Sequence, residues 1–140
     1  MSRVFITGGK GSIGRLLKAS LIDDGCEVLE PQIEGARIEN ENYFENVPNP
    51  EDIDVLYHLA ASIFVPNSWK NPVDFINVNV LGTTRVLEFC RKNNIKLIYV
   101  SSYAYGIPTY LPIDENHPVS VNNPYALSKM LAEKVCFFYG

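Results

Sequence analysis

The chain has 140 residues, of which 46% are hydrophobic, and its 16 acidic and 12 basic side chains give it a net charge of -4. This length and composition fit one globular domain with a buried core. The negative charge and a pI of about 5.1 argue against nucleic acid or an anionic membrane as partner. No apolar run approaches the length of a membrane span, so we expect a cytoplasmic protein.

The three cysteines, Cys26, Cys90 and Cys136, are widely spaced and contain no CxxC pair. This spacing predicts neither a disulfide framework nor a zinc site. We expect the cysteines to be small buried side chains, and we expect no metal.

A glycine-rich turn is the first motif of the chain. A short apolar run at 3–7 predicts a strand, and Gly8-Gly9-Lys10-Gly11-Ser12-Ile13-Gly14 leads from it into a helix that ends at Gly25. In a dinucleotide site such glycines permit a tight turn, admit a pyrophosphate to the backbone N–H groups, and allow close packing of helix on strand. The Gly-Lys-Ser/Thr ending of nucleoside triphosphatases is missing.

The second predicted strand, 26–29, is followed by the residues that would bind the adenosine ribose. An acidic residue is expected after this strand, where the chain has Gln32 or, displaced toward the strand, Glu30. NAD and NADP both stay open, with Arg15 and Arg37 as candidate partners of a 2′-phosphate. We expect a very short third strand at 37–40, lining the adenine, and mostly loop up to residue 54.

A fourth strand is predicted at 54–61, and it ends in His58-Leu59-Ala60-Ala61. Small residues at the carboxyl end of a parallel strand leave room for a ligand. His58 is either a base or a packed, hydrogen-bonded strand residue. Because no serine or cysteine nucleophile stands beside it in the sequence, we favour the packed interpretation.

A long helix is predicted from Pro72 to Asn93, and Asn79 lies amid its apolar residues. A buried amide there would bridge to a neighbouring strand or to water. The fifth strand, 96–100, ends in Ser101-Ser102, whose hydroxyl groups could hydrogen-bond a substrate oxygen.

Tyr125 and Lys129 are four residues apart on a predicted helix that begins at Pro124, so they share one helix face. A free phenol has a pKa of ~10, and a nearby cation favours its phenolate form. That arrangement makes proton exchange with a substrate hydroxyl or carbonyl feasible. Tyr125 is therefore the candidate acid/base, and Lys129 is the residue that tunes it.

Six motifs in this order resemble the extended short-chain dehydrogenase/reductase family, in its NAD-dependent sugar-nucleotide epimerase and dehydratase branch. They are the glycine turn, His58-Leu59-Ala60-Ala61, Asn79-Val80-Leu81-Gly82-Thr83, the serine pair with Tyr105-Gly106, Pro112-Ile113-Asp114-Glu115, and Pro124-Tyr125 through Lys129 with Glu133. The motifs and the resemblance predict these cofactor-binding residues: Gly8, Gly9, Gly11, Ser12, Ile13, Gly14, Gln32, Leu59, Ala60, Ala61, Asn79, Ser101, Tyr125 and Lys129.

The resemblance also implies the catalytic residues. Tyr125 would be the acid/base, Lys129 would favour its phenolate form and bind the nicotinamide ribose, and Asn79 would brace the site. A serine at the end of the fifth strand would orient the substrate oxygen. Strand register favours Ser102, whereas counting back from Tyr105 favours Ser101, because two residues separate the pair from Tyr105 where the family commonly has three.

The expected fold is an α/β domain over residues 1–140 with a doubly wound, parallel Rossmann-type sheet of strand order 3-2-1-4-5. The resemblance implies hydride transfer between NAD, with NADP as the alternative, and a hydroxyl of a nucleotide-sugar. It also implies a homodimer through the helices that start near Pro72 and Pro124. Family members are about twice as long, so we expect an incomplete domain without the substrate-binding lobe, inactive as this fragment. The rival hypothesis is a non-catalytic NAD-binding sensor or scaffold.

Overall fold

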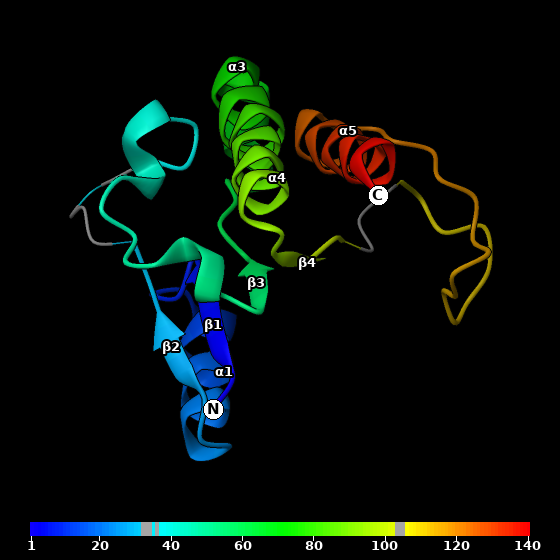
Figure 1. Cartoon of the computed structure of the whole chain (residues 1–140). Coiled ribbons are helices and arrows are strands. Elements are labelled where there is room, and N and C mark those ends of the chain that lie inside the picture. Colours follow the sequence, from blue (N-terminus) through cyan, green and yellow to red (C-terminus); the bar gives the residue numbers. More distant parts are fainter. Residues whose placement is uncertain (32–34, 36, 103–105) are drawn as a thin grey trace.

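Four parallel strands form the centre of the molecule (Figure 1). The computed structural model describes residues 1–31, 35, 37–102 and 106–140. Its strands are β1 (Arg3–Thr7), β2 (Glu27–Leu29), β3 (Val55–His58) and β4 (Lys96–Tyr99). They lie in the order β2-β1-β3-β4, and every pairing is parallel. The order predicted for the first, second, fourth and fifth expected strands is thereby confirmed.

The prediction of a short third strand at 37–40 is wrong. These residues form a turn in which Asn40 N donates to Arg37 O at 3.0 Å. The buried Ile38 side chain packs on a helix at Gly82, where an added Cβ would lie 2.5 Å from Ile38 Cγ2. Packing on the helix therefore holds this segment in place of a strand ladder. Two short 3-10 helices follow, η1 (Glu41–Phe44) and η2 (Pro50–Asp52).

Helices cover both faces of the sheet. The connection from β1 to β2 contains α1 (Ser12–Asp23), and the connection from β3 to β4 contains α4 (Gly82–Asn93). The two connections run toward opposite edges of the sheet, so right-handed crossovers put α1 and α4 on opposite faces. Accordingly α1 packs against β1 and β2, whereas α4 packs against β3 and β4. The domain is doubly wound, as predicted.

The hydrophobic core lies between the sheet and α4. Strands β1 and β3 contribute Phe5 and Leu56, which are fully buried, and α4 contributes Val86 and Cys90. The rings of Phe44 and Phe89 stack with their centroids 4.2 Å apart, which joins η1 to α4. This core fixes α4 on β3, and the carboxyl end of β3 is where the candidate site begins.

The long helix predicted from Pro72 to Asn93 is confirmed, with one irregular turn inside it. Its parts are α3 (Pro72–Ile76), the π-helical turn η3 (Asn77–Leu81) and α4, and the short α2 (Val65–Lys70) precedes them. Figure 1 shows α3, η3 and α4 as one green column. Single π turns inside α-helices often mark functional sites. The buried Asn79 lies in the middle of this one.

The last helix is α5 (Pro124–Tyr139). Asn123 caps it, because its Oδ1 accepts a hydrogen bond of 2.8 Å from Ala126 N, and Pro124 occupies the first turn. At the far end, Tyr139 Oη donates to Glu88 on α4 at 2.9 Å. Nearer the start of α5, Ser128 Oγ accepts from Asn79 Nδ2 of η3, so the column that ends in α4 and the helix α5 run side by side in the same direction. Among the residues described, no helix combines the length and the apolar character needed to cross a bilayer.

Candidate active site

A cleft of about 730 Å³ lies at the carboxyl ends of the central strands. Its lining brings together twelve of the residues predicted from the sequence: Gly8, Gly9, Gly11, Ser12, Ile13, Gly14, Leu59, Ala60, Ala61, Ser101, Tyr125 and Lys129. Asn79 and Ser102 are not part of this lining, and Gln32 falls outside the described residues. The crevice is where open parallel sheets bind ligands.

Two glycines shape the turn itself. Gly8 has φ of +73°, and a Cβ there would lie 2.7 Å from the backbone N of Ala60. A Cβ on Gly14 would lie 2.3 Å from Gly8 O. Both clashes involve backbone atoms, which cannot move aside as a flexible side chain can. Glycine at these positions lets the turn pack against the end of β3 and against the start of α1.

Gly11 differs from these two glycines. A Cβ there would meet one described neighbour within 4 Å, Gly8 O at 3.3 Å, so the protein itself scarcely needs glycine at this position. The missing side chain leaves room in the cleft instead. Gly11 is also the N-cap of α1, and no side chain caps this helix end. Its backbone N–H groups are the kind of donors that bind phosphate.

Glu30 follows β2 directly and lines the cleft. Its carboxylate forms an ion pair with Lys18 of α1 and occupies the place where a Cβ on Gly9 would point. Tyr43, which sequence reasoning did not assign to the site, also lines the cleft. Burial, and to a smaller extent the charge of Glu30, raises the pKa of Tyr43, so its phenol keeps its proton.

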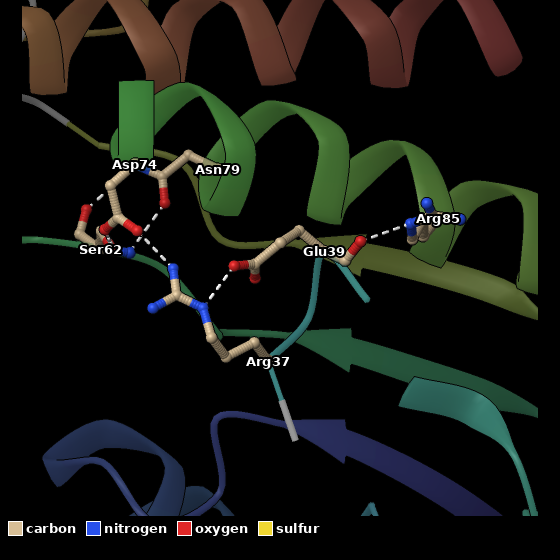
Figure 2. A network of polar contacts seen from close by, with 6 residues as sticks. All are labelled: Arg37, Glu39, Ser62, Asp74, Asn79 and Arg85. Atoms are coloured by element: carbon tan, nitrogen blue, oxygen red, sulfur yellow. Dashed lines mark hydrogen bonds and ion pairs between the residues drawn. The ribbon is translucent and has the colours of Figure 1, made fainter. Parts of the chain in front are cut away.

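A polar network forms the cleft wall beside the 37–40 turn (Figure 2). Arg37 donates to the carboxylates of Glu39 and Asp74, the latter on α3. Ser62 Oγ lies 3.5 Å from Asp74 Oδ2, and Arg85 Nε on α4 donates to Glu39 O at 2.6 Å. These contacts tie the turn to α3, to α4 and to the loop after β3. They also raise the pKa of Arg37, chiefly through the hydrogen bond with Glu39.

Glu39 Oε2 is a buried oxygen without a hydrogen-bond partner among the described residues. Glu39 Oε1 accepts from Arg37, and the residue lines the cleft. A buried carboxylate oxygen without a donor is costly, by about 1–3 kcal/mol. Glu39 therefore has an unused acceptor position beside the cleft.

Asn79 lies behind the cleft wall and joins its parts. Its Oδ1 accepts from Ser62 N at 2.8 Å, and its Nδ2 donates to Ser62 O at 3.0 Å and to Ser128 Oγ at 2.8 Å. Ser128 Oγ in turn donates to Tyr125 O at 2.7 Å. One buried amide thus fixes the loop after β3 and the first turn of α5, which bears Tyr125.

His58 is a packed, hydrogen-bonded residue, as the sequence favoured. Thr83 Oγ1 donates to Asn79 O at 2.6 Å, so it accepts from His58 Nε2 at 2.9 Å. His58 Nδ1 then accepts from Thr7 Oγ1 at 2.7 Å. Burial, and secondarily the charge of Lys129, lowers the pKa of His58 to about 3. The histidine is a neutral link between β1, β3 and the first turn of α4, whose Thr83 in turn bonds to Asn79 of the π turn.

Tyr125 and Lys129 face the segment that follows β4. Tyr125 Oη donates to Ser102 Oγ at 3.4 Å. Lys129 Nζ donates to Val100 O at 2.8 Å and lies 4.3 Å from the centroid of the Tyr99 ring. Lys129 is only 5% exposed, and this burial lowers its pKa to about 8. Its ammonium group is charged at neutral pH and loses its proton as the pH rises through about 8.

The two serines have different partners. Ser101 Oγ donates to Glu133 on α5, whereas Ser102 Oγ accepts from Tyr125. The structure therefore brings Ser102 to the candidate acid/base, in agreement with strand register.

Sequence reasoning missed Thr7, Thr83 and Ser128. The available signal was their position, because Thr83 and Ser128 are hydroxyl residues within the motifs that contain Asn79 and Tyr125, and Thr7 directly precedes the glycine turn.

The sequence was also compared with known proteins. The model of the NAD dependent epimerase/dehydratase family matches residues 4–140. A protein named putative UDP-glucose 4-epimerase, from Methanocaldococcus jannaschii, is 38% identical over 97% of this chain and 50% of its own length. The UDP-glucose 4-epimerase of Lactobacillus helveticus is 33% identical over 95% of this chain and 46% of its own. The chain thus spans about half the length of the curated relatives it matches.

Solved structures resemble the fold over the whole chain. RMD from Pseudomonas aeruginosa, complexed with NADPH, has a TM-score of 0.87 and 28% identity, covering 100% of this chain and 50% of that one. The UDP-glucose 4-epimerase from Bifidobacterium longum, in complex with NAD+ and UDP, has a TM-score of 0.86 and 26% identity, covering 98% of this chain and 48% of that one.

Proposed function

Because the chain belongs to the NAD-dependent epimerase/dehydratase family, we propose that it is the cofactor-binding and proton-transfer part of a nucleotide-sugar epimerase or dehydratase. The observation that carries this proposal is the shared cleft, which is lined both by the glycine turn and by Tyr125 and Lys129. Relatives named UDP-glucose 4-epimerase favour a UDP-sugar as the substrate.

The residues present fit a dinucleotide. The N-terminus of α1 and the room left at Gly11 would hold its pyrophosphate, and Glu39 Oε2 would accept from a donor of the ligand. The Glu30 carboxylate would accept hydrogen bonds from the hydroxyl groups of the adenosine ribose. Its negative charge would repel a 2′-phosphate, which favours NAD over NADP. Gln32 remains our second candidate for contact with the ribose. Arg37 is already engaged by Glu39 and Asp74.

When bound, NAD would supply the reversible hydride acceptor that the sugar chemistry requires. Tyr125 Oη would take the proton of the sugar hydroxyl and return it in the reverse step. Ser102 Oγ, which contacts Tyr125 Oη, would orient the reacting oxygen. The ammonium group of Lys129, fixed by Val100 O, would favour the phenolate form of Tyr125. Asn79 would keep α5 and the loop after β3 in register.

Titration of the purified chain with NAD tests the cradle. We expect Gly11→Val to weaken binding by about 10-fold or more, because its branched side chain would fill the room left for the pyrophosphate. Ala19→Val is the matched control, since it adds a branched side chain at an exposed position of the same helix. Equal affinity of wild type and Gly11→Val would refute the cradle.

A test of turnover separates catalysis from binding alone. An epimerase or dehydratase should convert at least one member of a panel of UDP-, GDP- and dTDP-sugars in the presence of NAD. A sensor or scaffold would bind NAD with the same cleft and convert none of them. The relatives' greater length makes the longest natural form of the protein the right material for the panel.

We also propose a homodimer through the column of α3 and α4 together with α5. Phe137 and Phe138 near the end of α5 are 77% and 88% exposed, which is costly for two neighbouring aromatic side chains in water. A second copy of the chain would cover them. Sedimentation velocity at micromolar concentration should give a dimer that Phe137→Ser with Phe138→Ser disrupts. A stable wild-type monomer would refute this proposal.

A further inference from the structure

Three side chains on one face of α5 hold the three residues that follow β4. Tyr125, Lys129 and Glu133 recur every four residues, so they lie above one another on the helix. The three contacts are Tyr125 Oη to Ser102 Oγ (3.4 Å), Lys129 Nζ to Val100 O (2.8 Å), and Ser101 Oγ to Glu133 Oε2 (2.5 Å). The proposed function uses the first two side chains and leaves Glu133 without a role.

Glu133 is well placed to act on Lys129. The carboxylate lies one helical turn beyond Lys129. Burial has the largest influence on the pKa of the ammonium group and lowers it, whereas Cys136 and, after it, Glu133 raise it. The pKa of the Cys136 thiol is itself raised to about 11, so Glu133 is the neighbour that carries a negative charge near pH 8. Lys129 is buried among a strand end, a tyrosine ring and its own helix. A buried ammonium group without an acidic neighbour would lose its proton more easily.

We propose that Glu133 is a positioning residue of the candidate site, which keeps Lys129 charged and is itself held in place by the Ser101 hydroxyl. This inference rests on the proposed function, in which a charged Lys129 serves Tyr125. It also divides the work between the two serines. Ser101 orients the carboxylate of Glu133, while Ser102 contacts Tyr125.

Two other titratable groups near Lys129, His58 and Cys136, keep their charge states near pH 8. His58 on β3 has its pKa lowered to about 3, and burial raises the pKa of the Cys136 thiol on α5 to about 11. Among the described residues, the ring of Tyr99 on β4 also contacts Lys129, and Tyr125 lies one helical turn before it on α5. Among these described groups, Glu133 is the one carboxylate, so its removal is the cleanest way to change the field at Lys129.

The titration of Lys129 can be followed directly by NMR of chains with ¹³C-labelled lysine side chains, the signal being assigned by its loss in Lys129→Arg. We expect a midpoint near pH 8 in the wild type, from the lowered pKa of Lys129. Glu133→Gln should move the midpoint down by about half a pH unit or more, because the amide still accepts from Ser101 but carries no charge. Glu133→Asp, which keeps the charge, should restore part of the shift.

Ser101→Ala tests whether the serine acts through Glu133. It should lower the midpoint by less than Glu133→Gln does, and it should add nothing in the Glu133→Gln background. Lys134→Ala is the control, because it alters an exposed side chain at the next position of the same helix. A midpoint unmoved by Glu133→Gln would overturn the proposal. If Ser101→Ala shifts the Lys129 midpoint equally in the wild type and in the Glu133→Gln background, the proposed role of Ser101 is wrong.

NAD titrations over pH tell this inference apart from the proposed function. If both hold, Glu133→Gln should lose NAD affinity at a lower pH than the wild type does. Chains that show the NMR shift but bind no NAD would support the coupling of Glu133 to Lys129 and refute the proposed function. Chains that bind NAD with an unmoved Lys129 midpoint would refute the role of Glu133 alone.

Discussion

The two sides of the cleft are built in different ways. The glycine side, Gly8–Gly14, consists of backbone, and its shape depends on side chains that are missing. The side that carries Tyr125 and Lys129 consists of side chains, held from behind by a chain of buried hydrogen bonds through His58 and Asn79. A change on the glycine side should therefore act through steric fit. A change on the other side should act through protons and charge.

Tyr125→Phe should give the largest effect, and that effect should be on turnover and not on cofactor binding. On any nucleotide-sugar that the protein turns over, we expect kcat to fall about 100-fold or more, because the variant has no proton to exchange. NAD affinity should stay nearly unchanged, since the ring keeps its edge contact with Phe75 at a centroid distance of 6.4 Å. Steady-state kinetics and an NAD titration measure both quantities. Tyr110→Phe, in the loop before α5, is the control, and undiminished turnover in Tyr125→Phe would show that this side does not work through its phenol.

Gly14→Ala and Gly11→Ala should distinguish the glycine that the fold requires from the glycine that ligand binding requires. The Cβ of Gly14→Ala would meet Gly8 O at 2.3 Å, so we expect the free energy of unfolding to fall by about 2 kcal/mol. Gly11→Ala meets Gly8 O at 3.3 Å and should cost less than half as much, while weakening NAD binding. Urea unfolding and NAD titration measure the two effects. The division fails if the two variants lose stability equally.

The buried histidine should make the side-chain half sensitive to acid. The pKa of His58 is lowered to about 3 from its ordinary 6.5, so between these values the unfolded chain binds a proton that the folded chain does not. The free energy of unfolding should therefore fall as the pH drops below about 6.5, by ~1 kcal/mol per pH unit. Urea unfolding between pH 7 and about 4 measures the slope.

His58→Gln should flatten this slope, because glutamine does not titrate. His117→Gln, which changes the other histidine of the chain, is the control. Equal slopes in the wild type and His58→Gln would mean that carboxylates alone account for the acid sensitivity.

Glu30→Gln should give the smallest effect, on the choice of cofactor. Removing the negative charge beside the glycine turn should improve NADP binding relative to NAD by about fivefold or less, since this carboxylate is partly exposed and already paired with Lys18. Glu27→Gln, at the first residue of β2 and paired with Arg3, is the control. Competition titrations with the two dinucleotides give the ratio, and a rise in NAD preference would contradict our placement of the ribose.

The sequence predicted the features that depend on neighbours in the chain. The glycine turn, the helix from Pro72 and the Tyr125–Lys129 spacing are local patterns, and the order of the four observed strands follows from crossover handedness. The expected strand at 37–40 is wrong, because Ile38 packs on Gly82 of α4 and the segment forms a turn. That contact joins residues far apart in sequence, and no pattern near residue 38 reveals it.

The hydrogen bonds that hold the site residues in place could not be predicted from local sequence patterns either. Thr7 contacts His58 across 51 positions, and Asn79 contacts Ser128 across 49. The sequence also left the choice between Ser101 and Ser102 open, because strand register favours Ser102 whereas counting back from Tyr105 favours Ser101. The contact with Glu133 that separates them spans 32 positions.

The π turn at Asn77–Leu81 also sets the angular phase between the two halves of its helix. Each residue of an α-helix advances the side-chain direction by about 100°, and a π turn contains an extra residue within one turn. Deleting a single residue here would give a more regular helix but rotate α3 against α4 by about that angle. Asp74 and Thr83 could then no longer reach Arg37 and His58 together. Apart from Asn79, the segment should tolerate substitutions better than it tolerates a change in its length of five residues.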